Sequence, residues 1–403
     1  MTRRVPPLTF EKEIYDEVHG FIDVTPIELL AISDCIFQRL RRIKQLGPAD
    51  LVFPGATHTR FSHSIGTMHV ASLMALNAGV VDEAVLQALR LAALLHDIGH
   101  MPFSHTLSDN HEEVTVFLIE NFLKEKLGDF ADRVVEILRG KDKLSPLVCS
   151  EVDSDRIDYM LRDALHTGVA YGKIDVGRVI RSVRLVKRGR AKWIMAFARG
   201  SETALESLLI SRFQLFKTVY YHKTVSGFEA LLQRIYKVML EEGLVDPPKE
   251  ILRDKSSWCL FDDVSLLSML KDSMRSNNEK IGYLSRQFIE RIPPKLILEY
   301  LPGNDESSSE ISEHLVKHDL EEYLSSKCGV PEQYILVYVG KVSPLKDPSQ
   351  LYIIDDVNLV PLISSRKTLL RSIVSEGYAP TRVYVIREYW KRISDCVANL
   401  GTR

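Results

Sequence analysis

The sequence lacks the features that define secreted, membrane and disordered proteins. Its five cysteines form no CxxC pair and have no regular spacing, so we expect no disulfide scaffold and a reducing compartment. No apolar run reaches the ~18 residues of a membrane span, and no apolar segment follows Arg3 and Arg4 as it would in a signal peptide. We therefore expect a cytoplasmic protein with no membrane partner.

An excess of charge of one sign is also missing. The 403 residues include 52 lysines and arginines against 54 aspartates and glutamates, a formal net charge of −2. Together with 45% hydrophobic residues, this balance excludes a disordered chain and a polybasic nucleic-acid-binding arm. A glycine-rich phosphate loop of the GxxxxGK(S/T) type is absent as well, so any phosphate would have to be bound by side chains from several segments.

Helical periodicity dominates the first three quarters of the chain. Apolar residues recur at the spacing of one helix face in Ile36–Leu46 and Val85–Leu95, which predicts helices packed on a core. The same pattern predicts one long helix over Glu202–Glu242. One interruption, Ser182–Phe197, alternates apolar and basic residues around a glycine, which predicts a β-hairpin. We expect a mainly α fold with this hairpin inserted.

The chain is expected to divide near residue 302. Pro302–Ser309 is polar and rich in turn formers, and we interpret it as a linker. The first domain would span residues 1–302, with its core at about 50–165 and further helices to about 300. A small α+β subdomain at 310–403 would follow. Its predicted elements are a helix at Ser364–Ser375 and strands at Tyr334–Val339, Leu351–Ile354 and Val383–Ile386.

Histidines are concentrated in one part of the chain. Seven of the 12 histidines lie between residues 58 and 111, where random placement would put fewer than two. They are His58, His63, His69, His96, His100, His105 and His111. Imidazole is the commonest transition-metal ligand and titrates near neutral pH, so the cluster predicts a metal site or a proton-transfer site.

The dipeptide His96-Asp97 sharpens this prediction. It closes an apolar helical segment, where a buried aspartate without a partner would be costly and a bound cation would remove that cost. A second acidic group is available in Glu151–Asp158. Two histidines with two aspartates form a mixed nitrogen and oxygen set, unlike a closed cysteine-rich zinc site. We expect a divalent metal ion as cofactor, drawn from Mn, Fe, Mg, Ni and Zn.

Two motifs give the sequence a family resemblance. Residues 53–64 (FPGATHTRFSHS) and 95–105 (LHDIGHMPFSH) resemble HD-domain phosphohydrolases, and more closely the deoxynucleoside triphosphate triphosphohydrolases among them. Similar stretches follow in the family's order over about residues 10–240. They are Ile43–Gly47, His111-Glu112, Asp155–Asp163 and Tyr220–Lys223. The resemblance implies an HD-domain helical core.

By this resemblance, the metal ligands would be His63, His96, Asp97 and Asp155. The reacting phosphate would be surrounded by His100, His105 and His111, with Glu112 orienting His111. The implied reaction is attack of a metal-activated water on the α-phosphorus, which releases deoxynucleoside and triphosphate. A histidine suits proton donation to the leaving 5′-oxygen, and we expect His111 to be that acid.

Substrate recognition is implied in the same way. Arginines would hold the phosphates, since a guanidinium pairs bidentately with phosphate oxygens, and Tyr159 would bond a phosphate oxygen. Gln45 and Asp163 would bond the 3′-hydroxyl, and Tyr220 would pack under C2′. The expected substrate-binding residues are Gln45, Leu46, Arg60, Arg156, Tyr159, Asp163, Arg212 and Tyr220.

Regulation and assembly are implied as well. In animal members of the family, a guanine nucleotide binds at the subunit interface, and Gln38 and Arg41 match two of its contacts here. Ser33 stands where the family has an aspartate. His222 and Lys223 are further effector-binding candidates, and we expect a homo-oligomer, either a dimer or a tetramer. The basic run at 178–192 fits a solvated hairpin, an effector-phosphate site or a nucleic-acid contact, although no nucleic-acid partner is expected.

Two rival functions stay open from the sequence. One is an HD phosphohydrolase acting on another nucleotide phosphoester, such as a nucleoside monophosphate or a signalling nucleotide. The other is a nucleotide-sensing or nucleic-acid-binding module that retains the HD scaffold. Arg60, Gln45, Asp163 and Tyr220 favour the triphosphohydrolase, and the complete set of metal ligands argues against a binding-only role.

Overall fold

The computed structural model describes residues 8–107, 110–189, 192–275, 279–301, 314, 319–340, 350–356, 358–365, 368, 370 and 378–400. Within them the protein is mainly helical with three small sheets, which confirms the expected fold class. In this part of the chain, no helix is both long and apolar enough to cross a membrane.

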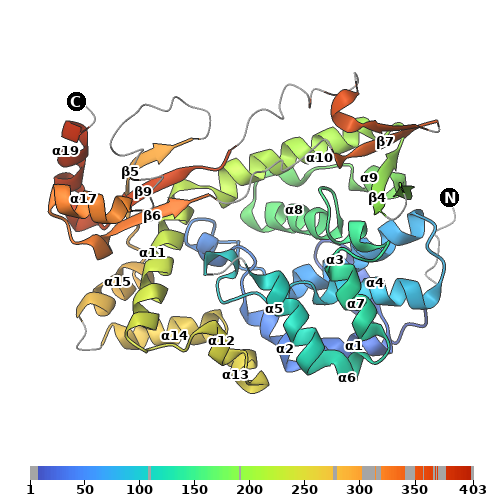
Figure 1. The fold of residues 1–403 in the computed structure, drawn as a ribbon, viewed down its shortest axis with the longest axis horizontal. Coiled ribbons are helices and arrows are strands. Elements are labelled where there is room, and N and C mark those ends of the chain that lie inside the picture. The colour runs from blue at the N-terminus through green and yellow to red at the C-terminus, as the bar shows by residue number, and fades with distance from the viewer. Residues whose placement is uncertain are drawn as a thin grey trace.

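Three helices form the centre of the molecule (Figure 1). Helix α3 (Arg60–Asn77) packs against α4 (Glu83–Leu95) and α8 (Ser154–Thr167). Most residues of α3 are apolar or small, and the helix is buried over most of its length together with the polar Arg60 and His63. Both α4 and α8 begin at an aspartate, Asp82 and Asp153, whose side chain accepts a backbone N–H of the first turn.

Further helices surround this centre and extend from it. Helix α7 (Phe130–Leu138) packs on α4, and α11 (Lys223–Glu241) packs on α15 (Glu279–Ile289). The other described helices are α1 (Pro26–Ile32), α2 (Cys35–Gln38), α5 (His111–Leu118), α6 (Lys124–Leu127), α9 (Val176–Ser182), α10 (Glu202–Leu215), α12 (Pro248–Ile251), α13 (Lys255–Leu260), α14 (Asp263–Ser273), α17 (Leu320–Cys328) and α19 (Trp390–Leu400).

The long helix expected over Glu202–Glu242 is broken in two. Helix α10 runs into a π-helical turn, Phe216–Tyr220, and α11 begins three residues later. His222 separates them, because its side chain accepts the backbone N–H of Thr224 and so caps α11. Periodicity alone does not reveal the break, since both halves keep the same apolar spacing. The turn directs Tyr220 toward the central helices.

The predicted hairpin is present, and it belongs to a larger sheet. Strands β3 (Val183–Arg188) and β4 (Lys192–Ala198) are antiparallel, and β7 (Tyr352–Asp355) and β8 (Asn358–Pro361) extend the sheet in the order β3-β4-β7-β8. A second sheet has the order β5-β9-β6, with strands Lys295–Tyr300, Thr381–Val385 and Ile335–Val339. A separate hairpin joins β1 (Lys12–Asp16) to β2 (Gly20–Val24).

Both larger sheets combine residues from the two sides of the expected domain boundary. Strand β5 precedes residue 302 yet pairs with β9, and β7 pairs in parallel with β4 of the hairpin. In Figure 1 these sheets lie at opposite ends of the molecule. Residues 295–300 form a strand where helix was expected because pairing with β9 overrides local propensity. The linker Pro302–Ser309 and most of the helix expected at Ser364–Ser375 lie outside the described residues.

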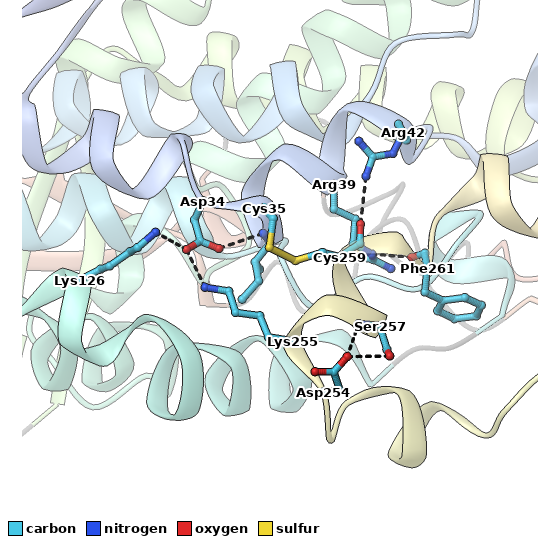
Figure 2. The surroundings of a disulfide bond; sticks show 11 residues. Asp34, Cys35, Arg39, Arg42, Lys126, Asp254, Lys255, Ser257, Cys259 and Phe261 are labelled. Carbon is cyan, nitrogen blue, oxygen red and sulfur yellow. Dashed lines mark hydrogen bonds and ion pairs between the residues drawn. A yellow bond between two sulfur atoms is a disulfide. The ribbon is translucent and has the colours of Figure 1, made fainter.

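Two disulfides correct the expectation from cysteine spacing. Cys35 bonds to Cys259, and Cys328 bonds to Cys396, although the partners lie 224 and 68 residues apart. Figure 2 shows the first, which ties α2 to α13 beside Asp34, whose carboxylate contacts Lys126 and Lys255. Such long separations leave no local signal in the sequence, and the cysteines do not support a reducing compartment.

Candidate metal and phosphate site

Four predicted metal ligands meet where the central helices converge. His63 comes from α3, His96 ends α4, Asp97 follows it, and Asp155 lies in the first turn of α8. His63 Nε2 is 3.1 Å from Asp155 Oδ1 and 3.6 Å from Asp97 Oδ2. His96 Nε2 is 3.3 Å from Asp97 Oδ1 and 3.8 Å from Asp155 Oδ1. One donor atom each of His63, His96 and Asp155 lies within 4.8 Å of the others, which is the spacing of a group that could hold a metal ion.

The orientation of both imidazoles suits a cation. His63 Nδ1 lies 2.8 Å from Asp158 Oδ2, and His96 Nδ1 lies 2.8 Å from the carbonyl oxygen of Ala93. Each Nδ1 therefore carries the proton, and each Nε2 turns its lone pair toward the cluster. Each buried Nε2 faces carboxylate oxygens of Asp97 and Asp155. A divalent cation fits this donor set of two imidazoles and two carboxylates.

The electrostatics of the cluster favour positive charge at its centre. Burial lowers the pKa of His63, but the carboxylates of Asp155 and Asp158 outweigh it and raise that pKa to about 10. Burial raises the pKa of Asp97, but the charges of Arg60 and His96 hold it well below its ordinary range. The folded protein therefore keeps its carboxylates ionised and attracts a cation or a proton to the same point.

Sequence reasoning missed the residues behind this cluster. Asp158 is fully buried and accepts two bonds of 2.9 Å from Arg162 and one from His63. His19 lies 2.7 Å from the second oxygen of Asp158, across 139 residues of sequence. Asp158 stands one helical turn after Asp155, so its place on the same face could have been predicted, whereas the contact with His19 could not.

The loop after Asp97 has a strained backbone and several supports. Phe103 and Ser104 both have positive φ, 57° and 59°. Asp263 holds the loop by accepting the backbone N–H of Phe103 at 2.7 Å and that of Lys44 at 2.9 Å. Ser104 in turn accepts Arg60 Nε at 2.8 Å, and Arg60 Nη1 reaches Asp97 Oδ2 at 2.5 Å. Ser104 and Asp97 together hold Arg60 beside the expected metal ligands.

Three predicted catalytic histidines gather next to the cluster. The rings of His100 and His111 stack with centroids 3.9 Å apart, and His105 lies edge-on to both. His100 Nε2 is 3.1 Å from Asp97 Oδ1, which joins the two groups. Burial lowers the pKa of both His100 and His111, so a proton placed on either is readily released. Glu112 is exposed and acts on His111 through its charge.

One cavity of about 1190 Å³ connects these groups with the predicted substrate residues. Of the catalytic, substrate and metal residues expected from the sequence, all except His63 line it, and His63 is fully buried. On one side Asp163 accepts Tyr220 Oη at 2.6 Å and contacts His58 Nε2 at 2.8 Å. Gln45 Oε1, nearby in the same wall, is buried without a partner in the part of the chain described. Leu46 adjoins it.

Each of the three arginines predicted to bind phosphate faces a carboxylate. Arg60 pairs with Asp97, Arg156 Nη1 lies 2.7 Å from Asp153, and Arg212 Nη1 lies 3.2 Å from Glu151. Burial raises the pKa of the Tyr159 hydroxyl, and the charges of Arg212 and Arg156 act against that rise, which places the tyrosine near both arginines. The carboxylates thus neutralise two buried guanidinium groups, those of Arg60 and Arg212, and the partly buried group of Arg156.

The effector-binding candidates lie outside this cavity. Gln38 accepts Arg41 Nε at 2.9 Å, and the guanidinium of Arg41 stacks 3.5 Å above the ring of Phe61. His222 and Lys223 stand at the start of α11, away from that pair in the chain. The structure thus shows two separate surface pairs, and their role in binding a nucleotide stays a prediction.

A helical core that brings histidines and aspartates in this order to one cavity defines the HD class of metal-site proteins. Residues 60–187 match the HD domain, and residues 174–400 match the HD associated region. The chain belongs to the HD-domain phosphohydrolase family with an HD-associated region.

Individual relatives agree with this assignment. The chain is 39% identical to an uncharacterised protein of Methanocaldococcus jannaschii over 67% of its own length and 57% of that protein. It is 29% identical to the deoxynucleoside triphosphate triphosphohydrolase SAMHD1 of Gallus gallus, over 72% of this chain and 56% of that one. A phosphohydrolase of Bacteroides thetaiotaomicron has the same fold, with a TM-score of 0.75, 25% identity, and coverage of 93% of this chain and 100% of that one. The chain spans little more than half the length of these two curated relatives.

Proposed function

We propose that the protein is a metal-dependent phosphohydrolase that converts deoxynucleoside triphosphates to deoxynucleoside and triphosphate. One observation carries the proposal: the mixed histidine and aspartate cluster opens into the same cavity as the three arginines predicted to bind phosphate and the predicted sugar-binding group. Similarity to SAMHD1, a protein named for this substrate class, supports the choice of a deoxynucleoside triphosphate. The cavity of about 1190 Å³ is large enough for a nucleotide.

His63, His96, Asp97 and Asp155 would hold the metal. A divalent cation there would supply a water nucleophile near neutral pH, because coordination lowers the pKa of water from ~16 to ~7, and would offset phosphoryl charge. Arg60, fixed beside Asp97, would bind the phosphate closest to the cluster. Arg156, Arg212 and Tyr159 would bind the rest of the phosphate chain, and several converging cations are what a triphosphate needs when no phosphate loop exists.

The other cavity residues would bind the sugar and move the proton. Gln45 and Asp163 would bond the 3′-hydroxyl, and Tyr220, held by its bond to Asp163, would close the space below C2′. His111 would donate a proton to the departing 5′-oxygen. The negative charge of a bound phosphate favours protonated His111, whereas burial lowers its pKa, so the proton transfers readily once the bond breaks.

Product analysis tests the proposal directly. The protein would be incubated with each deoxynucleoside and ribonucleoside triphosphate under Mg, Mn, Co and Ni, and the products separated by chromatography. We expect equal amounts of deoxynucleoside and triphosphate, and no turnover by His96→Ala or Asp97→Ala. Release of monophosphate and pyrophosphate, or hydrolysis of monophosphates in place of triphosphates, would instead identify one of the rival phosphohydrolase activities.

We further propose that the protein is a homo-oligomer with a nucleotide effector bound near Gln38, Arg41, His222 and Lys223. Light scattering coupled to size exclusion, with and without each nucleotide, measures this. A monomer under all conditions would contradict it.

A further inference from the structure

The deepest arginine of the cavity already has an anionic partner. Arg212, on α10, is 1% exposed and lines the cavity wall. Its Nη1 lies 3.2 Å from Glu151 Oε2, and among the described residues its Nε has no hydrogen-bond partner. A guanidinium binds a phosphate or carboxylate best through two parallel N–H donors. Arg212 therefore contacts an anion through Nη1 and keeps a second buried donor, Nε, without a partner among the described residues.

Glu151, unlike Asp153 two residues further on, has no part in a helix cap. Asp153 accepts the backbone N–H groups of Ser150 and Arg156 and caps α8, so its contact with Arg156 is part of the fold. Glu151 lies in the loop before α8, outside any helix or strand, and its side chain is 14% exposed to the cavity. Its carboxylate can move away from Arg212 without breaking a helix cap.

We propose that Glu151 is an exchangeable counter-ion, displaced from Arg212 by the terminal phosphate of the substrate, and that it thereby sets the selectivity for phosphate-chain length. This inference rests on the proposed function, which places the reacting phosphate at the metal cluster. A phosphate chain that reaches Arg212 replaces the carboxylate at Nη1, and its further oxygens can bond donors that Glu151 leaves unused, such as Nε. A nucleotide with a single phosphate at the cluster does not reach Arg212 and leaves the ion pair intact.

Binding of inorganic tripolyphosphate tests this without turnover. Calorimetric titrations in EDTA would compare wild type with Glu151→Gln, a change that keeps size and removes the competing charge. We expect tripolyphosphate to bind about tenfold tighter to Glu151→Gln, as for a close charge pair, and a deoxynucleoside monophosphate to bind equally to both. Equal or weaker binding of tripolyphosphate by the variant would overturn the proposal.

Glu120→Gln is the matched control. Glu120 also lines the cavity, but it pairs with Arg139 at 3.2 Å in a half-exposed position. Removing its charge should change tripolyphosphate affinity by less than about twofold, because an exposed charge is screened by solvent. If both glutamate variants gain the same affinity for tripolyphosphate, the change in net charge alone explains the result and a specific exchange at Arg212 is refuted.

A double-mutant cycle with Arg212→Gln completes the test. The gain from Glu151→Gln should vanish when Arg212 is absent, and its persistence would also refute the exchange. If triphosphates are hydrolysed but Glu151→Gln binds tripolyphosphate as wild type does, the exchange is wrong and the proposed function stands. If Glu151→Gln binds tripolyphosphate more tightly but no deoxynucleotide is hydrolysed, the exchange at Arg212 stands and the proposed function is wrong.

Discussion

Replacing Asp158 by asparagine should weaken metal binding without touching a metal ligand. Asp158 is fully buried, and its two oxygens serve His63, Arg162 and His19 at 2.7–2.9 Å. Asparagine keeps the shape but removes the charge and places an N–H₂ group opposite a donor. Breaking a buried ion pair costs about 3–5 kcal/mol, and losing the outer partner of a ligand histidine costs about 10–100-fold in metal affinity.

Two measurements separate these effects. Urea unfolding in EDTA should show a free energy of unfolding lower by about 3 kcal/mol or more. Titration of Mn²⁺, followed by electron paramagnetic resonance, should show the weaker affinity because His63 Nδ1 no longer has a fixed acceptor and Nε2 is no longer held toward the cation.

Glu28→Gln is the control for burial alone. Glu28, on α1, is fully buried and accepts bonds from Arg90 at 2.6 and 2.8 Å, and neither residue is an expected metal ligand. This variant should lose comparable stability and keep wild-type Mn²⁺ affinity. If Asp158→Asn binds Mn²⁺ as tightly as wild type, the argument that Asp158 orients His63 fails.

Three further outcomes follow from the same contacts. His111→Ala should keep the metal but lose about 10²–10⁴-fold in kcat, the range for a general acid, and an undiminished kcat would place the proton donor elsewhere. In EDTA the free energy of unfolding of the wild type should fall as pH rises from ~6.5 toward 10, because folding raises the pKa of buried His63 to about 10 and the folded state holds a proton that the unfolded chain has released. Urea unfolding of His63→Gln should depend less on pH. A wild-type free energy of unfolding that does not change over this pH range would contradict the role of His63. Cys35→Ser should lower the free energy of unfolding by about 2–5 kcal/mol in oxidising buffer and by much less in reducing buffer, whereas Cys149→Ser, the control, should leave it unchanged. If Cys35→Ser and the wild type have the same unfolding curve in oxidising buffer, the Cys35–Cys259 disulfide does not form.

Part of this site could be predicted because its residues lie in local patterns. Helix geometry sets the positions of His96-Asp97, at the end of an apolar helix, and of Asp155, in a helical segment. The family resemblance of the motifs then indicated that these residues meet at one site. The hairpin at residues 183–198 followed from period-two alternation in the same way. In each case a few neighbouring residues contain the signal.

The remainder depends on contacts between distant segments. Nothing near Asp263 in the sequence indicates that it holds the backbone of Phe103, 160 residues away. The disulfide partners, the bond of His19 to Asp158 and the break before α11 are equally hidden, because each is decided by the packing of separate elements. The pairing of Glu151 with Arg212 belongs here too, since a loop carboxylate shows no periodic pattern.

The central claim is that His63, His96, Asp97 and Asp155 close around one divalent cation. Crystals grown with Mn²⁺ and measured at the manganese absorption edge test it most directly. We expect a single strong anomalous peak in contact with these four side chains, and no such peak in crystals of His96→Ala. A peak held instead by His100, His105 and His111, or no peak at saturating Mn²⁺, would contradict it.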